Sequence, residues 1–188
     1  MDYYDFSFIH KTYDYEEKSY YQLYKFTSTI LNQVYLVSFY EYPQNLYIAK
    51  FYLKSERFSS TKYSNITFGK FNHLSLNDSD YVKNFLYVMN TILQIAIHIT
   101  HKDRLASFVF LGSHKETEMH KINPDNTFRN TKRYLVYKKY VSRYFNPLEF
   151  EHIDSESSSI YIVANRKNTN LSKSLIEHYI THHIIPSL

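Results

Sequence analysis

The chain has almost none of the residues on which the common catalytic and cofactor motifs depend. Its 188 residues include no Cys, no Trp, two Gly and four Pro. Without Cys there is no disulfide, no thiolate nucleophile and no Cys-ligated zinc. Gly69 and Gly112 are too few for a dinucleotide-binding fingerprint, and too far apart for a P-loop or a nucleophile elbow. We therefore predict no cofactor, and the balance leans against an enzyme.

Long apolar runs and a basic leader are also missing. The first five residues, MDYYD, are acidic, which is not typical of a signal peptide. The most apolar run, residues 92–100, is about half a membrane span and is broken by Gln94 and His98. We expect no membrane association and a cytoplasmic location, in a bacterial or phage-like protein.

Aromatic residues are abundant instead, with 21 Tyr and 14 Phe. Hydrophobic residues make up 44% and charged residues 21%, which is near the globular norm. The length fits one domain, since single domains run to ~50–250 residues. The net charge of +4 permits an anionic partner without requiring one. An AT-rich genome would encode the same bias, so the tyrosine count alone indicates no function.

The first half of the chain favours strands. Residues 1–19 are rich in acids and are interpreted as a partly ordered lead-in. Aromatic and β-branched residues then recur between turn residues, which is typical of an antiparallel meander. The predicted strands are residues 20–27, 33–41, 46–54 and 62–68.

Helical periodicity dominates the second half. Residues 80–100 repeat apolar side chains at helical spacing after good N-caps, and a buried strand follows at 105–111. A helical region spans 113–145, with a break near Asn123-Pro124. A hairpin of residues 148–153 and 160–164 comes next. Residues 166–174 are linker-like, and 175–185 form a terminal helix. The predicted class is α+β, in one domain, with a mostly antiparallel sheet packed by a long helix and a second, basic helix.

The turn Gly112-Ser113 is a candidate anion site. A strand that ends in Gly-Ser and opens a helix can present free N–H groups to an anion, and Arg129 and Arg133 could join it. The alternative is that the turn only ends the strand and caps the helix. Both interpretations stay open on the sequence.

A basic helix is the candidate for nucleic-acid binding. Residues 126–145 hold no acid. The basic residues are Arg129, Lys132, Arg133, Lys138, Lys139 and Arg143. Arg129, Lys132 and Arg133 would share one helix face, where they could meet phosphates. A merely solvated face of an amphipathic helix explains the same pattern.

Histidines offer one further pattern. His178 and His182 are four residues apart on the predicted terminal helix, a spacing that could hold zinc or nickel. The sequence places no third ligand beside them, so we predict no metal.

Short motifs run from residue 65 to residue 167. They are Asn65, Phe68-Gly69, Asn77-Asp78, Asp80, Lys83, Val88, residues 108–111 and Gly112-Ser113. This pattern resembles an uncharacterised Bacteroidota-type family of small proteins. After the Gly-Ser turn that family has arginines and then Tyr, whereas this chain has Glu116, Glu118 and His120. If that arginine is functional in the family, this chain either lacks the function or supplies Arg129 instead. The resemblance implies no activity, but a context of mobile elements or defence loci.

The order of elements carries a second resemblance. Three antiparallel strands, a helix, a strand, a helix and two strands is also the order in Gcn5-related acetyltransferases. Those proteins bind the pyrophosphate of acetyl-CoA with a Gly-rich turn before the first of these helices. The corresponding residues 69–80 have one Gly and two acids. The resemblance therefore implies the fold without the activity.

Three functional hypotheses remain. The leading one is a non-enzymatic binding or protein-interaction module, because both faces of the predicted meander carry large side chains, such as Tyr35 and Phe39 on one and Tyr40 on the other. The second face would be covered by residues 1–19, by a second copy or by a partner. The alternatives are a degenerate acyltransferase-like enzyme with an anionic cofactor at Gly112-Ser113, and a nucleic-acid binder.

Overall fold

The computed structural model describes residues 2–59, 62–63, 78–112, 116–125 and 127–184. Within them seven strands form one sheet, in the order β1-β2-β3-β4-β5-β7-β6. The strands are β1 Phe6–Asp14, β2 Ser19–Ser28, β3 Gln33–Tyr42, β4 Leu46–Leu53, β5 Ser107–Leu111, β6 Phe150–Ser155 and β7 Ile160–Asn165. The helices are α1 Asp78–Lys102, α2 Lys132–Val141 and α3 Lys173–Tyr179. The predicted α+β class is confirmed.

The meander β1–β4 is antiparallel throughout. Its tightest connection joins β3 to β4, where Gln44 and Asn45 both have positive φ, 58° and 57°. Asn is one of the few non-glycine residues that tolerates this region, and paired positive φ values suit a tight hairpin turn. The predicted strands 20–27, 33–41 and 46–54 match β2, β3 and β4 to within one or two residues. The fourth, 62–68, lies mostly outside the described residues.

Strand β1 was not predicted. The segment interpreted as a lead-in forms a nine-residue edge strand that pairs with β2 from Phe6↔Phe26 to Asp14↔Ser19, with a register shift between Phe8 and His10. The acids that led the sequence analysis to a lead-in lie mostly outside the strand, since Asp14 alone of the five is in β1, and an edge strand can keep most of its side chains in water. One ring packs against the core, since Phe6 is partly buried and lies edge-on against Tyr24, whereas Phe8 meets the same tyrosine but is 47% exposed.

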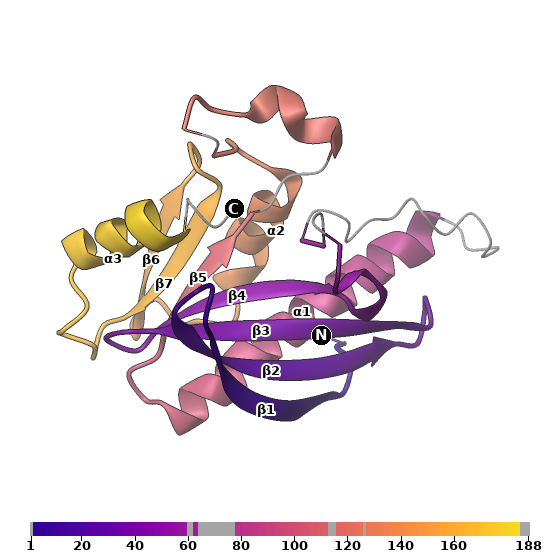
Figure 1. Cartoon of the computed structure of the whole chain (residues 1–188), viewed down its shortest axis with the longest axis horizontal. Coiled ribbons are helices and arrows are strands. Elements are labelled where there is room, and N and C mark those ends of the chain that lie inside the picture. Colours follow the sequence, from indigo (N-terminus) through magenta and orange to yellow (C-terminus); the bar gives the residue numbers. More distant parts are fainter. Residues whose placement is uncertain (1, 60–61, 64–77, 113–115, 126, 185–188) are drawn as a thin grey trace.

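Helices α1 and α2 cover one face of the sheet, and α3 lies on the other (Figure 1). The α1 face holds the larger core, to which α1 contributes Met89, Ile92, Leu93 and Ala96, all fully buried. Phe85 and Leu86, which belong to the same apolar repeat of residues 80–100, are half-buried. This long helix is the element that the sequence predicts best.

The second face is covered by the chain itself. Its core includes Tyr42, Ile48 and Val109, and α3 packs on it through Ile176. The segment before α3, predicted as linker-like, is held in place because the Asn168 side-chain amide donates to Gln44 O at 2.7 Å and to Leu105 O at 3.1 Å. The sequence analysis expected residues 1–19, a second copy or a partner to cover this face, and it did not consider α3.

The strand pairing changes from antiparallel to parallel between β4 and β5. These strands are parallel and pair only from Leu46↔Ser107 to Ala49↔Phe110. Strand β4 continues to Leu53 without β5, and the two strands diverge (Figure 1). Helix α2, which follows β5 in the chain, packs on β5 and β7 beside this divergence. The β6–β7 hairpin completes the sheet as predicted.

Candidate functional site

Gly112 ends β5 and is closed in by its neighbours. Its N–H donates to Ser159 O at 2.9 Å, and its carbonyl accepts from Thr131 Oγ1 at 2.8 Å. A Cβ at this position would lie 2.5 Å from Thr131 Oγ1 and 2.6 Å from Tyr134 Cβ. The glycine is thus needed for the close approach of α2 to the sheet, and its N–H is not available to an anion. Ser113 lies outside the described residues.

The predicted basic face is not assembled. Helix α2 begins at Lys132, with Thr131 as its N-cap, so Arg129 lies before the helix and is exposed. Lys132 is exposed on the first turn, whereas Arg133 is 7% exposed and turned toward the sheet. The prediction that these three residues share one face was wrong, because the helix starts three residues later than its basic sequence suggests.

Acids of the β6–β7 hairpin neutralise the middle of α2. Lys138 Nζ lies 2.7 Å from Asp154 and 2.9 Å from Glu156, and these hydrogen bonds raise the pKa of Lys138. Lys139 and Arg143 are exposed, each with its cation over the ring of Tyr140. The sequence could not show this pairing, since the acids come from a separate hairpin.

A group of exposed aromatic and apolar side chains lies on the β1–β2 hairpin instead. Tyr13, Tyr15 and Tyr20 are 37%, 86% and 52% exposed. Ring centroids of Tyr13 and Tyr15 are 5.2 Å apart, and those of Tyr13 and Tyr20 are 5.1 Å apart, in both cases edge to face. Farther along β1, Phe8 and Ile9 are 47% and 42% exposed. We call these five residues the hairpin patch. The sequence analysis missed it because it assigned no strand to residues 1–19.

The hairpin tip is anchored to the second face of the sheet by buried polar contacts. Lys50 is 7% exposed and its Nζ lies 2.5 Å from Glu17 Oε1 and 5.0 Å from the ring centre of Tyr40. Tyr40 donates to Asp14 at 3.0 Å, and burial raises the pKa of this tyrosine. Asp14 also accepts from the backbone N–H groups of Glu16 and Glu17. The turn between Tyr13 and Tyr20 is therefore fixed rather than free.

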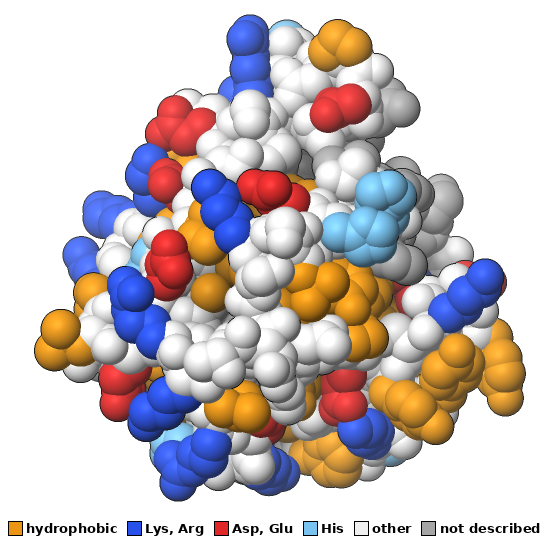
Figure 2. Space-filling view, turned by 90° about the vertical axis from the view of Figure 1, so that its left-hand side faces the viewer, with side chains coloured by type: hydrophobic (Ala, Val, Ile, Leu, Met, Phe, Trp, Pro, Cys, Tyr) orange, Lys and Arg blue, Asp and Glu red, His pale blue; other side chains and the backbone are white. Residues whose placement is uncertain are grey.

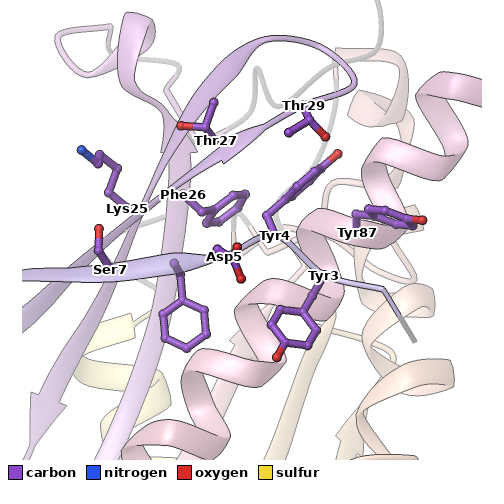
Figure 3. A pocket seen from close by; sticks show the side chains of 10 residues that line it. Tyr3, Tyr4, Asp5, Ser7, Lys25, Phe26, Thr27, Thr29 and Tyr87 are labelled. Atoms are coloured by element: carbon purple, nitrogen blue, oxygen red, sulfur yellow. The ribbon is translucent and has the colours of Figure 1, made fainter.

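A shallow pocket of about 480 Å³ lies where β1 begins. Figure 3 shows Tyr4 between Phe26 and Tyr87, with Lys25 and Ser7 at the side of the pocket. The Tyr4 and Phe26 rings stack at 5.8 Å, and Tyr4 Oη donates to Asn84 at 2.8 Å. These contacts hold the start of the chain against α1. The side chains that line the pocket, such as Tyr4 and Phe26, therefore belong to the hydrophobic core.

The histidine pair is in place on the C-terminal helix. The rings of His178 and His182 stack with centroids 4.3 Å apart. Within the described part of the chain there is no group of three or more His, Cys, Asp or Glu side chains that could hold a metal ion.

One face of the molecule shows a mixed surface. In Figure 2 hydrophobic side chains lie in several separate groups among Lys, Arg, Asp and Glu.

No described helix combines the length and apolar character that a membrane crossing needs. In comparisons with protein-family models, curated proteins and solved structures, nothing matches this chain.

Proposed function

We propose that this chain is a non-enzymatic protein-interaction module that acts in the cytoplasm and docks a protein through the hairpin patch. The observation that supports it is the group of three exposed tyrosines on an anchored turn, in which the Tyr13 ring contacts both of the others. Tyrosine supplies a large contact area and loses little conformational entropy on binding, and it is enriched in the centres of interfaces. An anchored turn also lowers the cost of ordering the surface on binding.

Docking through side chains is favoured over addition of a strand to β1. The register shift between Phe8 and His10 twists the edge, and Lys11 lies on it. Bulges and lysines are the devices by which proteins protect an edge strand from pairing with another chain. Lys102 lies 5.6 Å above the ring of Phe8, so a partner with apolar side chains beside a carboxylate would suit the patch.

Site-specific crosslinking tests this proposal. A photoreactive phenylalanine analogue at Tyr15 should give one product of defined mass in the native cells, either with another protein or with a second copy. The same analogue at Leu148, which is 85% exposed and lies just before β6 at the other edge of the sheet, should give none. Light scattering of the purified chain separates the two kinds of partner. Equal products at both positions would contradict the proposal.

A matched pair of substitutions gives the second measurement. Tyr13→Ser with Tyr20→Ser should remove the product formed at position 15, because interface tyrosines commonly contribute more than ~1–2 kcal/mol each. The fold should be kept, since both side chains are exposed. Retention of the full yield in the double variant would show that the patch does not bind.

Nucleic-acid binding is the weaker candidate, because the structure leaves fewer free cations on α2 than the sequence predicted. We expect DNA and RNA affinities at physiological salt weaker than ~10⁻⁴ M, the loose end of non-specific binding. Fluorescence anisotropy at two ionic strengths measures this. Tighter binding that weakens steeply with salt, and whose salt slope is flattened by Lys139→Glu with Arg143→Glu, would favour this function instead.

The acyltransferase-like alternative stays a prediction. Four strands come before α1, one more than in the order on which that resemblance rests, and β5, α2 and the β6–β7 hairpin then follow as in that order. Most of residues 69–80, where those enzymes bind pyrophosphate, lies outside the described residues. The N–H of Gly112 is already donated to Ser159, which weakens the case for an anionic cofactor at that turn.

A further inference from the structure

Arg133 is a buried cation that has no acidic partner in contact within the described part of the chain. It is 7% exposed, and desolvation lowers its pKa. Its guanidinium lies 5.1 Å from the ring centre of Phe51, and Nη1 donates to Tyr63 O at 3.0 Å. Among the described residues no carboxylate lies within 4.0 Å of it to form an ion pair. A guanidinium buried in this way costs free energy unless an anion compensates it.

The acid that attracts Arg133 is already hydrogen-bonded to other groups. Glu118 is 2% exposed and attracts Arg133 at longer range. Its Oε1 accepts from Lys121 Nζ and from the backbone N–H of Lys132, both at 2.9 Å. The local set of Arg133, Lys121 and Glu118 therefore has one positive charge in excess. The first turn of α2 carries no acid, and its dipole adds to the positive potential.

Tyr137 supplies a second, independent sign of a ligand. It lies four residues after Arg133, so both side chains lie on the same side of α2. Tyr137 is fully buried, and its hydroxyl has no hydrogen-bond partner among the described residues. Its ring lies 5.2 Å from Phe110, as the guanidinium lies against Phe51. A buried hydroxyl without a partner is rare, because it forfeits its hydrogen bonds to water.

The two side chains meet the sheet where it opens. Phe51 is on β4 beyond the last pair that joins β4 to β5, and Phe110 is in that last pair. Arg133 and Tyr137 thus face the two strands at the point where they diverge. The site uses none of the five residues of the hairpin patch and does not depend on the function proposed above.

We propose that Arg133 and Tyr137 form a binding site for an oxyanion, a carboxylate or phosphate group of a small ligand. The guanidinium can donate two parallel N–H bonds to such a group, and the phenol can donate a third. Both groups are pre-positioned on one helix, and the surrounding aromatic rings keep the local dielectric low. The anion would neutralise the excess charge that the protein leaves on Arg133.

Thermal melting with simple salts tests the site. Sodium phosphate and sodium acetate serve as probes, with sodium chloride at equal ionic strength as the reference. The wild-type melting temperature should rise with at least one probe, and the probe that acts distinguishes phosphate from carboxylate. Arg133→Met should melt higher than wild type in chloride, because it removes an uncompensated charge, and it should lose the response to the probe.

Two further variants keep the test decisive if Arg133→Met does not fold. Arg133→Lys keeps the charge but loses the paired donors, and should weaken probe binding by at least about tenfold in calorimetry. Tyr137→Phe should weaken it by up to about tenfold. The exposed Arg143→Met is the control and should bind as wild type does. No response in wild type, or an equal response in Arg133→Lys and wild type, would overturn the proposal.

Discussion

Replacing Ile92 with Asp should abolish folding. Ile92 has no exposed surface and lies in the middle of α1, within the large core. The substitution forfeits ~1.5–3 kcal/mol of apolar burial. It also buries a carboxyl group, which costs ~2–7 kcal/mol if it stays neutral and unbonded. The sum is comparable with the whole stability of an ordinary domain, ~5–15 kcal/mol.

Circular dichroism and thermal melting measure this effect. The Ile92→Asp variant should show no cooperative transition, whereas wild type should show one. Val82→Asp is the matched control on the same helix, because Val82 is 55% exposed. It should melt within a few degrees of wild type, since exposed substitutions usually change stability by less than ~0.5 kcal/mol. A native-like Ile92→Asp would show that α1 is not part of the core.

Helix α1 and strands β2–β4 were predictable because their side-chain periodicity reflects burial directly. A helix packed on a sheet repeats its apolar residues at helical spacing, and the N-caps before residue 80 limit where it begins. Strand β1 could not be predicted in this way, because few of its side chains are buried. Eight of its residues pair with β2, yet most of its side chains are exposed, and the acids on both sides of the strand make the segment resemble an acidic tail.

The candidate sites were only partly predictable, since they depend on contacts between distant segments. Arg133 was a candidate anion ligand on the sequence, but its burial follows from where α2 begins, which Thr131 sets. The neutralisation of Lys138 needs Asp154 and Glu156 from another hairpin. Periodicity reports which residues lie on a face of one element, but not which element meets that face.

Gly112→Ala is the second substitution with a large expected effect. The added Cβ would lie 2.5 Å from Thr131 Oγ1, 2.6 Å from Tyr134 Cβ and 2.9 Å from Ser159 O. All three distances are shorter than van der Waals contact, and two of the three neighbours cannot rotate away. Helix α2 would have to move off the end of β5. Overpacking of this kind costs ~1–3 kcal/mol, and we expect the upper end or more because several contacts clash at once.

Urea unfolding of Gly112→Ala, with and without Thr131→Gly, measures that cost and identifies its source. Thr131→Gly alone removes the N-cap side chain of α2 and should cost only a few tenths of a kcal/mol through the cap, with some further loss from its buried hydrogen bond to Gly112 O. In the double variant the shortest clash is gone, so the two substitutions should cost less together than the sum of their separate effects. The rescue should be partial, because Tyr134 Cβ and Ser159 O still meet the new methyl group. A Gly112→Ala protein as stable as wild type would contradict the close packing of α2 on β5, and with it the burial of Arg133 and Tyr137 against the sheet.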